Sequence, residues 1–348
     1  MNARLDIAQA PPRVPAYAGW QQELRDAITD PAELCALLGL DPAGLASAHA
    51  ALAGFPLRVP REFVTRMRHG DARDPLLLQV LPVAAELQPS PGFGLDPVGD
   101  LASRAGSAGL LHKYQGRALL VTTGACAVHC RYCFRRHFPY ADESPLADGW
   151  RATFERLRAD PSIEELILSG GDPLSLSDRR LAQLTDGLAS LPQIRRLRLH
   201  TRYPIVLPAR VDRGLLNWLA DLPLQKVVVV HANHANELNQ AVRDACRDLT
   251  AAGATLLNQS VLLAGVNDTV QALAELSEAL FAAGVLPYYL HLLDRVQGAA
   301  HFEVAEPVAV RLHAELMGRL PGYLVPRLVR EVPGAPSKTP VTLDGGDY

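Results

Sequence analysis

The chain has 348 residues, of which 48% are hydrophobic, and its formal net charge is −3. Acidic and basic residues are interspersed, so neither nucleic acid nor an anionic membrane is predicted as a partner. The first 20 residues lack the apolar core of a signal peptide, and no stretch approaches the roughly 20 apolar residues of a membrane span, so we expect a cytoplasmic globular protein.

The N-terminal part is predicted to be helical. Residues 1 to about 18 are rich in proline and alanine, and we expect loose order there. Between Gly19 and about Met67, capping residues precede apolar runs of helical period. Two of these runs, DPAELCALLGL and DPAGLASAHAAL, begin with Asp-Pro; Asp is a good N-cap, and Pro suits the first helical turn. With the Pro-punctuated connection that follows, this region covers residues 1–108.

Residues 109–300 are predicted to form an α/β core. Its strands are six short runs rich in leucine or β-branched residues: 117–123, 164–170, 196–202, 226–232, 255–263 and 286–293. Several are almost continuously apolar, which is typical of parallel strands buried on both faces. From the second strand on they begin about 30 residues apart, the length of a βα unit. This rhythm predicts a partial (β/α)6 barrel of the TIM type, with a doubly wound open sheet as the alternative.

Polar residues follow or end nearly every predicted strand. These positions are Thr122–Cys126, Ser169–Asp172, His200–Arg202, His231–Asn236, Asn258–Ser260 and Asp294. A barrel builds its active site on the rim formed by the strand C-termini. An open sheet instead gathers its ligands at one crevice. Because all six strands contribute, the pattern favours the barrel.

Three of the five cysteines, Cys126, Cys130 and Cys133, lie within the eight residues CAVHCRYC. The other two, Cys35 and Cys246, are distant in sequence and are predicted to be buried free thiols. A zinc site would need a fourth ligand, which a histidine of the same loop could supply. A disulfide pair is disfavoured in a reducing compartment. The remaining interpretation is a [4Fe–4S] cluster, in which three thiolates leave one iron open to an exogenous ligand.

The spacing Cys-x3-Cys-x2-Cys after the first strand of a six-unit βα chain resembles the signature of radical S-adenosylmethionine enzymes. In that family the open iron chelates the amino and carboxylate groups of S-adenosylmethionine. An electron from the cluster, which needs an external reductant, then cleaves the sulfonium and yields a 5′-deoxyadenosyl radical. The resemblance therefore implies a [4Fe–4S] cluster and S-adenosylmethionine.

The motif SGGDPL ends the second strand and resembles the glycine-rich segment that binds the amino group of S-adenosylmethionine in that family. The implied ligands are Ser169, Gly170, Gly171 and Asp172. The two glycines would let a ligand approach the backbone closely. A plain strand-to-helix turn with Asp172 as its N-cap is the alternative.

Lys338 lies in a loop rich in Gly, Pro and Ser, after the strand-like run YLVPRLVRE. Taken alone, it predicts only a solvated charge. Its neighbourhood changes that interpretation, because the chain resembles the lysine 2,3-aminomutase family from about Leu57 to Val341. The blocks that carry the resemblance are the cysteine loop, SGGDPL, HANHANE, LLNQSVLLAGVND, LPYYLHLLD, GAAHF and PSKTP. The phrases LLHKY, CRYCFRRHFPY and PYYLHLLDRVQGAAHF are most similar to the short bacterial branch that works with elongation factor P.

The resemblance implies an isomerase that interconverts L-α-lysine and (R)-β-lysine by a radical 1,2-amino shift. Lys338, in the C-terminal segment 301–348, would hold pyridoxal 5′-phosphate covalently, and this cofactor supplies a π-bond that accepts a neighbouring radical. The cofactor phosphate would be bound by Lys113, Arg117 and Arg202. Lys113 stands where the longer enzymes carry arginine, so a bidentate contact is lost there. Surface ion pairs are the alternative for all three.

The family assigns the two ends of lysine to different residues. Arg135 would bind the carboxylate, and Asp294 and Glu331 the distal ammonium. Glu331 stands where the longer enzymes have aspartate, and its extra methylene moves the carboxylate by about 1.5 Å. Ordinary ion pairs are the alternative for each. His231 and Gln259 would contact S-adenosylmethionine, unless they are a core histidine and a capping glutamine.

Two further expectations and two rival interpretations complete the prediction. The product would be attached to elongation factor P by a partner ligase, and the enzyme itself could form a homo-oligomer. One rival is an aminomutase for another amino acid such as glutamate, although Asp294 and Glu331 would repel a distal carboxylate. The other rival is an iron–sulfur or zinc protein without catalytic activity.

Overall fold

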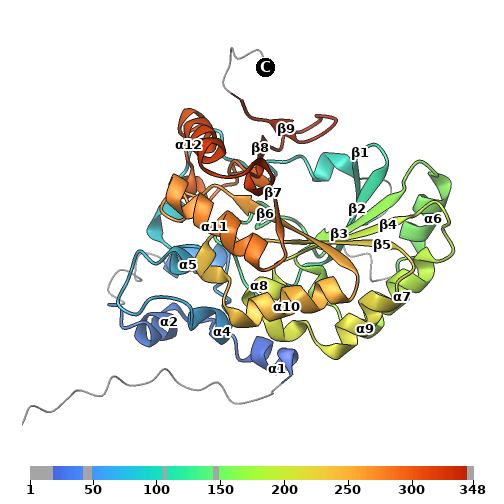
Figure 1. The fold of residues 1–348 in the computed structure, drawn as a ribbon, viewed down its shortest axis with the longest axis horizontal. Coiled ribbons are helices and arrows are strands. Elements are labelled where there is room, and N and C mark those ends of the chain that lie inside the picture. The colour runs from blue at the N-terminus through green and yellow to red at the C-terminus, as the bar shows by residue number, and fades with distance from the viewer. Residues whose placement is uncertain (1–18, 42–48, 105–107, 144–148, 343–348) are drawn as a thin grey trace, which may run out of the picture.

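The structure, a computed structural model, describes residues 19–41, 49–104, 108–143 and 149–342. The predicted loose order of residues 1 to 18 lies outside these ranges. Figure 1 shows helices on the outside of one curved sheet, with the N-terminal helices gathered at one end of it. No helix of the described ranges combines the length and apolar character needed to cross a bilayer.

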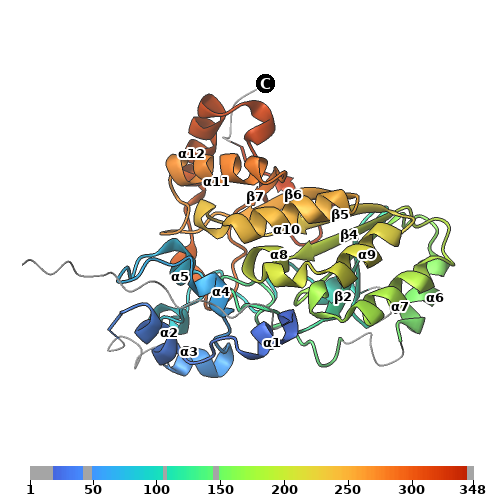
Figure 2. The same cartoon turned by 60° about the horizontal axis from the view of Figure 1, so that its bottom comes forward.

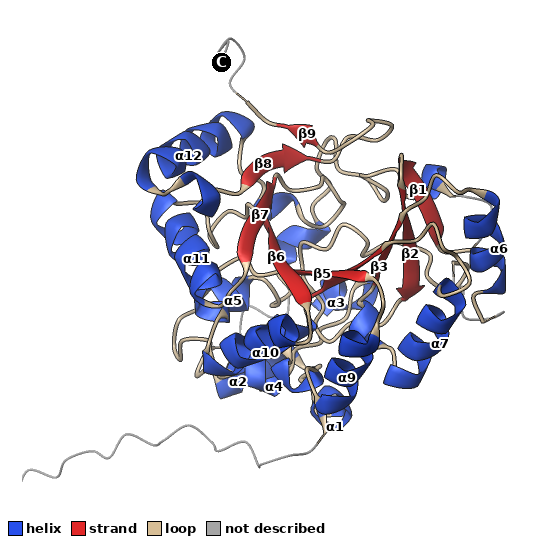
Figure 3. Cartoon of the chain, turned by 45° about the vertical axis from the view of Figure 1, so that its right-hand side comes forward, coloured by secondary structure: helices blue, strands red, loops and turns tan. Residues whose placement is uncertain are grey.

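The sheet has nine strands that follow one another in chain order from β1 to β9. They are β1 (Leu110–Tyr114), β2 (Arg117–Thr123), β3 (Glu165–Gly170), β4 (Arg196–Thr201), β5 (Gln225–Val230), β6 (Ala254–Val261), β7 (Leu286–His291), β8 (Arg327–Arg330) and β9 (Thr339–Pro340). Neighbours from β2 to β8 are parallel, whereas β1 pairs antiparallel with β2 and β9 antiparallel with β8. A doubly wound sheet would reverse its strand order part-way, so this sheet is a partial barrel (Figure 3).

All six predicted strands are present, as β2 to β7. The prediction of a partial TIM-like barrel with an N-terminal helical extension is thus confirmed. The hairpin strand β1 was not predicted. The strand-like run before Lys338 forms β8, which pairs with β7 and adds a seventh parallel strand. The boundaries near residues 108 and 300 stay predictions.

Six helices connect the parallel strands and cover the outside of the barrel: α6 (Arg151–Ala159), α7 (Asp178–Leu188), α9 (Arg213–Asp221), α10 (Gln240–Ala251), α11 (Val270–Ala282) and α12 (Glu306–Arg319). The short helix α8 (Tyr203–Val206) follows β4. In α7, α9, α10 and α11 a polar side chain at the N-cap accepts a hydrogen bond from the first turn; these caps are Ser177, Asp212, Asn239 and Thr269. Each such cap stabilises its helix by about 1 kcal/mol.

The N-terminal helices are α1 (Trp20–Arg25), α2 (Pro31–Leu37), α3 (His49–Gly54), α4 (Arg61–Val64) and α5 (Pro75–Leu78). They lie together on one side of the sheet (Figure 2). Their buried side chains Phe63 and Leu76 belong to the same apolar cluster as Leu166 of β3 and Leu197 of β4. The region therefore packs on the barrel as part of its core.

The N-terminal region also holds the cysteine loop. The backbone N–H of His129 donates to Arg58 O at 3.0 Å, and that of Arg131 donates to Gln79 O at 2.8 Å. The Arg131 side chain is fully buried and pairs with Glu86. Since these contacts lie on both sides of Cys130, the N-terminal region fixes the loop against the barrel rim.

Candidate active site

The barrel encloses a cavity of about 850 Å³ that is lined by residues of its strands and of the loops that follow them. Its lining contains every residue that the sequence predicted for a site: Lys113, Arg117, Cys126, Cys130, Cys133, Arg135, Ser169, Gly170, Gly171, Asp172, Arg202, His231, Gln259, Asp294, Glu331 and Lys338. The structure thus brings together residues that are more than 200 positions apart in the sequence. Their individual roles stay predictions.

The three cysteines form one end of the cavity, in the loop after β2. All three are free thiols. Burial, together with the charge of Cys130, raises the pKa of Cys133 to about 11. Burial and the nearby Asp172 raise the pKa of Cys126 well above its ordinary value. Clustered thiols of this kind need a bound metal to become thiolates, so the donor set fits an iron–sulfur cluster.

The two histidines of this loop do not complete a zinc site. The ring of His129 stacks on Phe55, and its Nδ1 lies 2.8 Å from Pro56 O. His137 Nε2 lies 3.1 Å from Gln297 O. Across the described ranges, no three His, Cys, Asp or Glu side chains converge on a position for a single metal ion. A cluster does not require such convergence, because each of its thiolates binds a different iron.

The glycines of SGGDPL have a packing role that the sequence did not reveal. A Cβ on Gly170, whose φ is +118°, would lie 2.7 Å from Thr123 O, and one on Gly171 would lie 2.5 Å from Ala125 O. The backbone that approaches so closely is therefore the chain's own cysteine loop. This contact locks the end of β3 against that loop, whatever ligand the segment binds.

Asp172 is the N-cap of the turn Pro173–Ser175, as the alternative interpretation held. Its Oδ1 accepts hydrogen bonds from Leu174 N and Thr201 Oγ1, and its Oδ2 accepts one from Arg202 N. Burial raises its pKa to about 6. Both carboxylate oxygens thus accept hydrogen bonds from the fold, and the contact of Asp172 with S-adenosylmethionine stays a prediction.

Arg202 lies at the cysteine end of the cavity. Its guanidinium donates to Cys130 Sγ, Tyr132 Oη, Gln79 Oε1 and Glu237 Oε2. Lys113 and Arg117, the other two residues predicted to bind the cofactor phosphate, line the same cavity, and the role of Arg202 as a phosphate ligand stays a prediction. Its Nη1 and Nη2 groups already donate hydrogen bonds to the cysteine loop and to buried acceptors around it.

Lys338 forms the opposite end of the cavity. Strands β8 and β9 form a hairpin in which Arg330 is opposite Thr339, so Glu331 and Lys338 face each other where the loop between the two strands begins and ends. Lys338 Nζ donates to Glu331 Oε2 at 2.9 Å and lies 5.8 Å from the centroid of the Tyr289 ring. Tyr114 also donates to Glu331. Burial raises the pKa of Glu331, but Lys338 and Tyr114 together hold it below its usual value.

A buried acid that the sequence did not reveal, Asp100, joins the two ends. Its Oδ1 lies 2.7 Å from Lys113 Nζ, and its Oδ2 lies 2.7 Å from Arg135 Nε. Burial alone would raise the pKa of Asp100, but Arg135 and Lys113 hold it below its usual value. Arg135 also donates to Ser169 Oγ at 2.9 Å. Arg135 is thus paired with an acid, as its alternative interpretation held, while part of its guanidinium still lines the cavity.

Asp294 lies in the cavity wall just after β7. Within the described part of the chain, its carboxylate has no hydrogen-bond or ion-pair partner. Burial raises its pKa to about 7; Lys338 lowers this value and Glu331 raises it. A carboxylate without a partner beside a second acid is a site for a cation.

Three histidines and a glutamine line the wall between the two ends. The Nε2 atoms of His200, His231 and His291 and the Oε1 atom of Gln259 are buried and have no hydrogen-bond partner among the residues that the structure describes. Burial lowers the pKa of all three histidines, to about 3 for His231, so the rings are neutral. Unpaired polar atoms in a cavity are satisfied by a polar ligand or by water. His200 and His291 were not predicted as site residues, although the strand-end pattern contained His200.

Residues 120–276 match the model of the radical SAM superfamily. The chain is 50% identical to the L-lysine 2,3-aminomutase of Escherichia coli K12, over 94% of this chain and 96% of that one. It is 45% identical to the enzyme of the same name from Haemophilus influenzae, over 92% and 94% of the two chains. The chain belongs to the L-lysine 2,3-aminomutase family. To the Clostridium subterminale member of this family it is 32% identical, over 92% of this chain and 77% of that one.

Membership makes the protein a radical SAM enzyme of the aminomutase kind and implies a [4Fe–4S] cluster and S-adenosylmethionine. Cys126, Cys130 and Cys133 are the residues of this aminomutase that would hold the cluster. The superfamily match spans β3 to β6, and β2 from Leu120 onward, so it covers the cysteine loop and most of the barrel. Lys338, Glu331 and Asp294 lie beyond it, and their roles are not settled by that match.

Proposed function

We propose that this enzyme interconverts L-α-lysine and (R)-β-lysine by a radical 1,2-amino shift, with pyridoxal 5′-phosphate held by Lys338. The observation that carries the proposal is the common cavity, in which Lys338 and two acids face three free cysteines. The relatives that match nearly the whole chain bear the name L-lysine 2,3-aminomutase, which supports lysine as the substrate.

The charges along the cavity suit lysine. Asp294 and Glu331 would bind the distal ammonium, and the cavity-facing part of Arg135 would bind the carboxylate. Asp294 offers an unpaired carboxylate, while Glu331 would have to share its charge with Lys338. Glutamate fits the same cavity poorly, because its distal carboxylate would meet the negative charges of Asp294 and Glu331.

The residues at the lysine end also suit pyridoxal 5′-phosphate. When bound, this cofactor supplies the π-bond through which an amino group can move between neighbouring carbons. Lys338 offers the amine for covalent attachment, and Glu331 holds that amine in place by the 2.9 Å hydrogen bond. Arg117 lies over the Tyr114 ring at 4.6 Å and has no ion-pair partner among the described residues, so its charge is open to a phosphate. Lys113 would have to leave Val98 O or Asp100 to join it.

At the other end, Cys126, Cys130 and Cys133 would hold the cluster, and S-adenosylmethionine bound there would supply the radical chemistry needed at C3 of lysine. The neutral rings of His231 and His200 and the amide of Gln259 offer unpaired atoms for its polar groups. An external one-electron donor must reduce the cluster.

The product would serve elongation factor P. The resemblance of LLHKY, CRYCFRRHFPY and PYYLHLLDRVQGAAHF to the short bacterial branch supports this use. A partner ligase would then attach β-lysine to a lysine of that factor. Incubating the enzyme's product with the ligase and the factor, followed by mass spectrometry, should give one added lysyl unit; a factor that keeps its original mass contradicts this step.

The proposed activity is tested by turnover of two amino acids in parallel. The enzyme is reconstituted anaerobically with iron, sulfide and pyridoxal 5′-phosphate, then given S-adenosylmethionine, dithionite and either lysine or glutamate. Chromatography should detect β-lysine from lysine and no β-glutamate. Conversion of glutamate at a comparable rate, or cleavage of S-adenosylmethionine without any β-amino acid, would overturn the assignment.

A further inference from the structure

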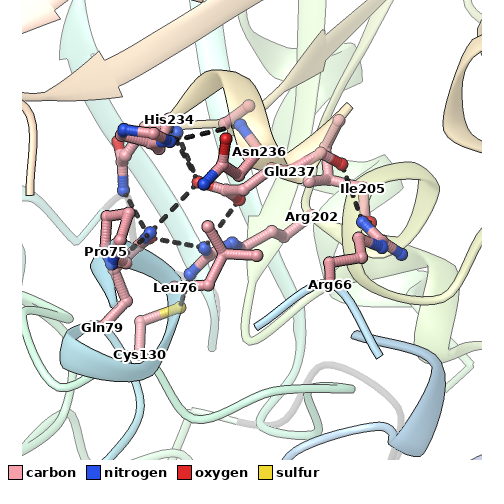
Figure 4. A network of polar contacts seen from close by, with 12 residues as sticks. Arg66, Pro75, Leu76, Gln79, Cys130, Arg202, Ile205, His234, Asn236 and Glu237 are labelled. Atoms are coloured by element: carbon pink, nitrogen blue, oxygen red, sulfur yellow. Dashed lines mark hydrogen bonds and ion pairs between the residues drawn. The ribbon is translucent and has the colours of Figure 1, made fainter. Parts of the chain in front are cut away.

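Arg202 contacts a cluster ligand directly. It follows β4 and is 7% exposed, and its Nη1 donates to Cys130 Sγ at 2.7 Å and to Tyr132 Oη at 2.8 Å. Figure 4 shows its guanidinium between the Cys130 sulfur and the side chain of Glu237. A donor with a full positive charge is therefore aimed at one of the three sulfurs.

The position of this guanidinium is fixed from the other side. Its Nη2 donates to Gln79 Oε1 at 2.6 Å and to Glu237 Oε2 at 3.0 Å. Both acceptors are fully buried. Gln79 comes from the N-terminal region and Glu237 ends the turn Ala235–Glu237 after β5, so three separate segments hold one arginine (Figure 4).

Glu237 is held equally well. Its Oε1 accepts hydrogen bonds from the backbone of Asn233 and His234 and from Gln79 Nε2. A buried ion pair stabilises a fold only when its remaining hydrogen bonds are satisfied, and even then an apolar replacement is often as stable. Fold stability alone thus gives little reason for this pair, whereas the contact with a cysteine sulfur gives a functional one.

We propose that Arg202 is a positioning residue for Cys130 that raises the reduction potential of the iron–sulfur cluster, and that Glu237 limits this effect. Hydrogen bonds to the sulfurs and nearby charge set the potential of such clusters. On reduction the cluster gains one electron from a low-potential donor, and a cation beside its ligand stabilises the more negative reduced form. The inference rests on the cluster that the family implies, not on the identity of the amino acid substrate.

The test is a redox titration of the reconstituted enzyme without lysine or pyridoxal phosphate. The reduced cluster is quantified by electron paramagnetic resonance while dithionite and mediators set the potential. At the wild-type midpoint, Arg202→Met should lower the ratio of reduced to oxidised cluster about tenfold, which corresponds to about 59 mV for one electron. Arg202→Lys keeps the charge and should recover most of this loss.

Arg198→Lys is the matched control. Arg198 lies on the same strand and lines the same cavity, but it pairs bidentately with Glu165 and does not contact a cysteine. The ratio of reduced to oxidised cluster in Arg198→Lys should equal that of the wild type. An unchanged ratio in Arg202→Met at full iron content would overturn the proposal, and so would an equal fall in Arg198→Lys.

Glu237→Gln provides a test that does not depend on whether Arg202→Met folds and keeps its cluster. It removes the negative charge but keeps an acceptor for the backbone donors, so the cation beside Cys130 is less neutralised. The ratio of reduced to oxidised cluster should therefore rise, opposite in sign to Arg202→Met. A fall or no change in Glu237→Gln contradicts the inference even if Arg202→Met loses its cluster. Since the readout needs no substrate, it is independent of whether β-lysine is formed.

Discussion

The two ends of the cavity are built in different ways. The cysteine loop is held by backbone hydrogen bonds to the N-terminal region, by the packing of Gly170 and Gly171, and by the buried guanidinium of Arg202. The lysine end depends on a two-residue strand, and Ser337 beside Lys338 is exposed. A metal cluster needs a fixed frame, whereas a lysine that releases a cofactor to the substrate, as proposed for Lys338, needs freedom to move.

The two ends also differ in charge. Arg202 and Arg135 place positive charge near the cysteines, where thiolates and the carboxylate of S-adenosylmethionine would lie. Asp294 and Glu331 place negative charge near Lys338. A zwitterionic substrate can lie along this gradient in one direction only, which explains how the cavity could select the carbon that faces the cluster.

Removing one cysteine should abolish activity while leaving the lysine end intact. In Cys133→Ala we expect bound iron to fall from about four per chain to near zero, because three thiolates are the minimum for a cluster with one open iron. Pyridoxal phosphate should still bind. Iron analysis and the cofactor's absorbance measure both outcomes. Cys246→Ala, which changes a buried thiol of α10, is the control and should keep its iron.

Lys338→Ala is the converse change. It should remove the absorbance of covalently bound pyridoxal phosphate and lower turnover by about 10³-fold or more, since the covalent nucleophile is lost. Bound iron should be unchanged. Lys226→Ala is the matched control, because the amine of Lys226, at the start of β5, donates to the backbone carbonyls of Ala220 and Ala252. Full activity in Lys338→Ala would contradict the assignment of the covalent nucleophile to Lys338.

Asp294→Asn should weaken the binding of lysine. Removing one partner of a buried charge pair costs about 3 kcal/mol, or roughly 100-fold in kcat/KM. The loss should appear mainly in KM, because the distal ammonium lies far from the reacting carbons. Steady-state kinetics at saturating S-adenosylmethionine measure it. An unchanged KM would show that Asp294 does not bind the ammonium.

The pH dependence of binding follows from the same residue. Burial raises the pKa of Asp294 to about 7, so the group is neutral below that pH and ionised above it. Only the ionised form attracts an ammonium, so kcat/KM for lysine should rise with pH through this range. In Asp294→Asn this rise should disappear. A profile that is the same in both proteins contradicts the assignment.

Asp100→Asn should have the smallest effect. Asn keeps the shape but loses the charge that holds Arg135 and Lys113, and a weakened charged hydrogen bond costs about 1 kcal/mol, or roughly fivefold in KM. Iron content and cofactor absorbance should stay at wild-type values. A large loss of iron instead would mean that Asp100 supports the cysteine loop and not the substrate site.

The sequence predicted the barrel well because its signals are local. Each signal, whether an apolar strand, a helix cap or the cysteine cluster, is made by residues that lie within a few positions of one another in the sequence. The partners of the site residues could not be predicted in this way. Asp100 pairs with Arg135 across 35 positions and Arg202 reaches Gln79 across 123, so only the folded chain reveals these contacts. For the same reason, the contact of Arg202 with Cys130 could not be predicted, and its role as a phosphate ligand stays a prediction.

Lys338 is the extreme case. Its own neighbourhood predicts a solvated charge, and only the resemblance of distant blocks suggested otherwise. Lys338 lies in the cavity wall because β8 pairs with β7 and the chain then turns back to form β9. This pairing depends on the whole barrel and leaves no local mark in the sequence.

The most direct test of the account is transfer of an isotope between the two ends. Lysine deuterated at C3 is incubated anaerobically with the enzyme, S-adenosylmethionine and dithionite, and the products are analysed by mass spectrometry. If both ends act on one substrate molecule, deuterium appears in 5′-deoxyadenosine and returns to β-lysine. Formation of 5′-deoxyadenosine without deuterium, while lysine is still converted, would contradict the account.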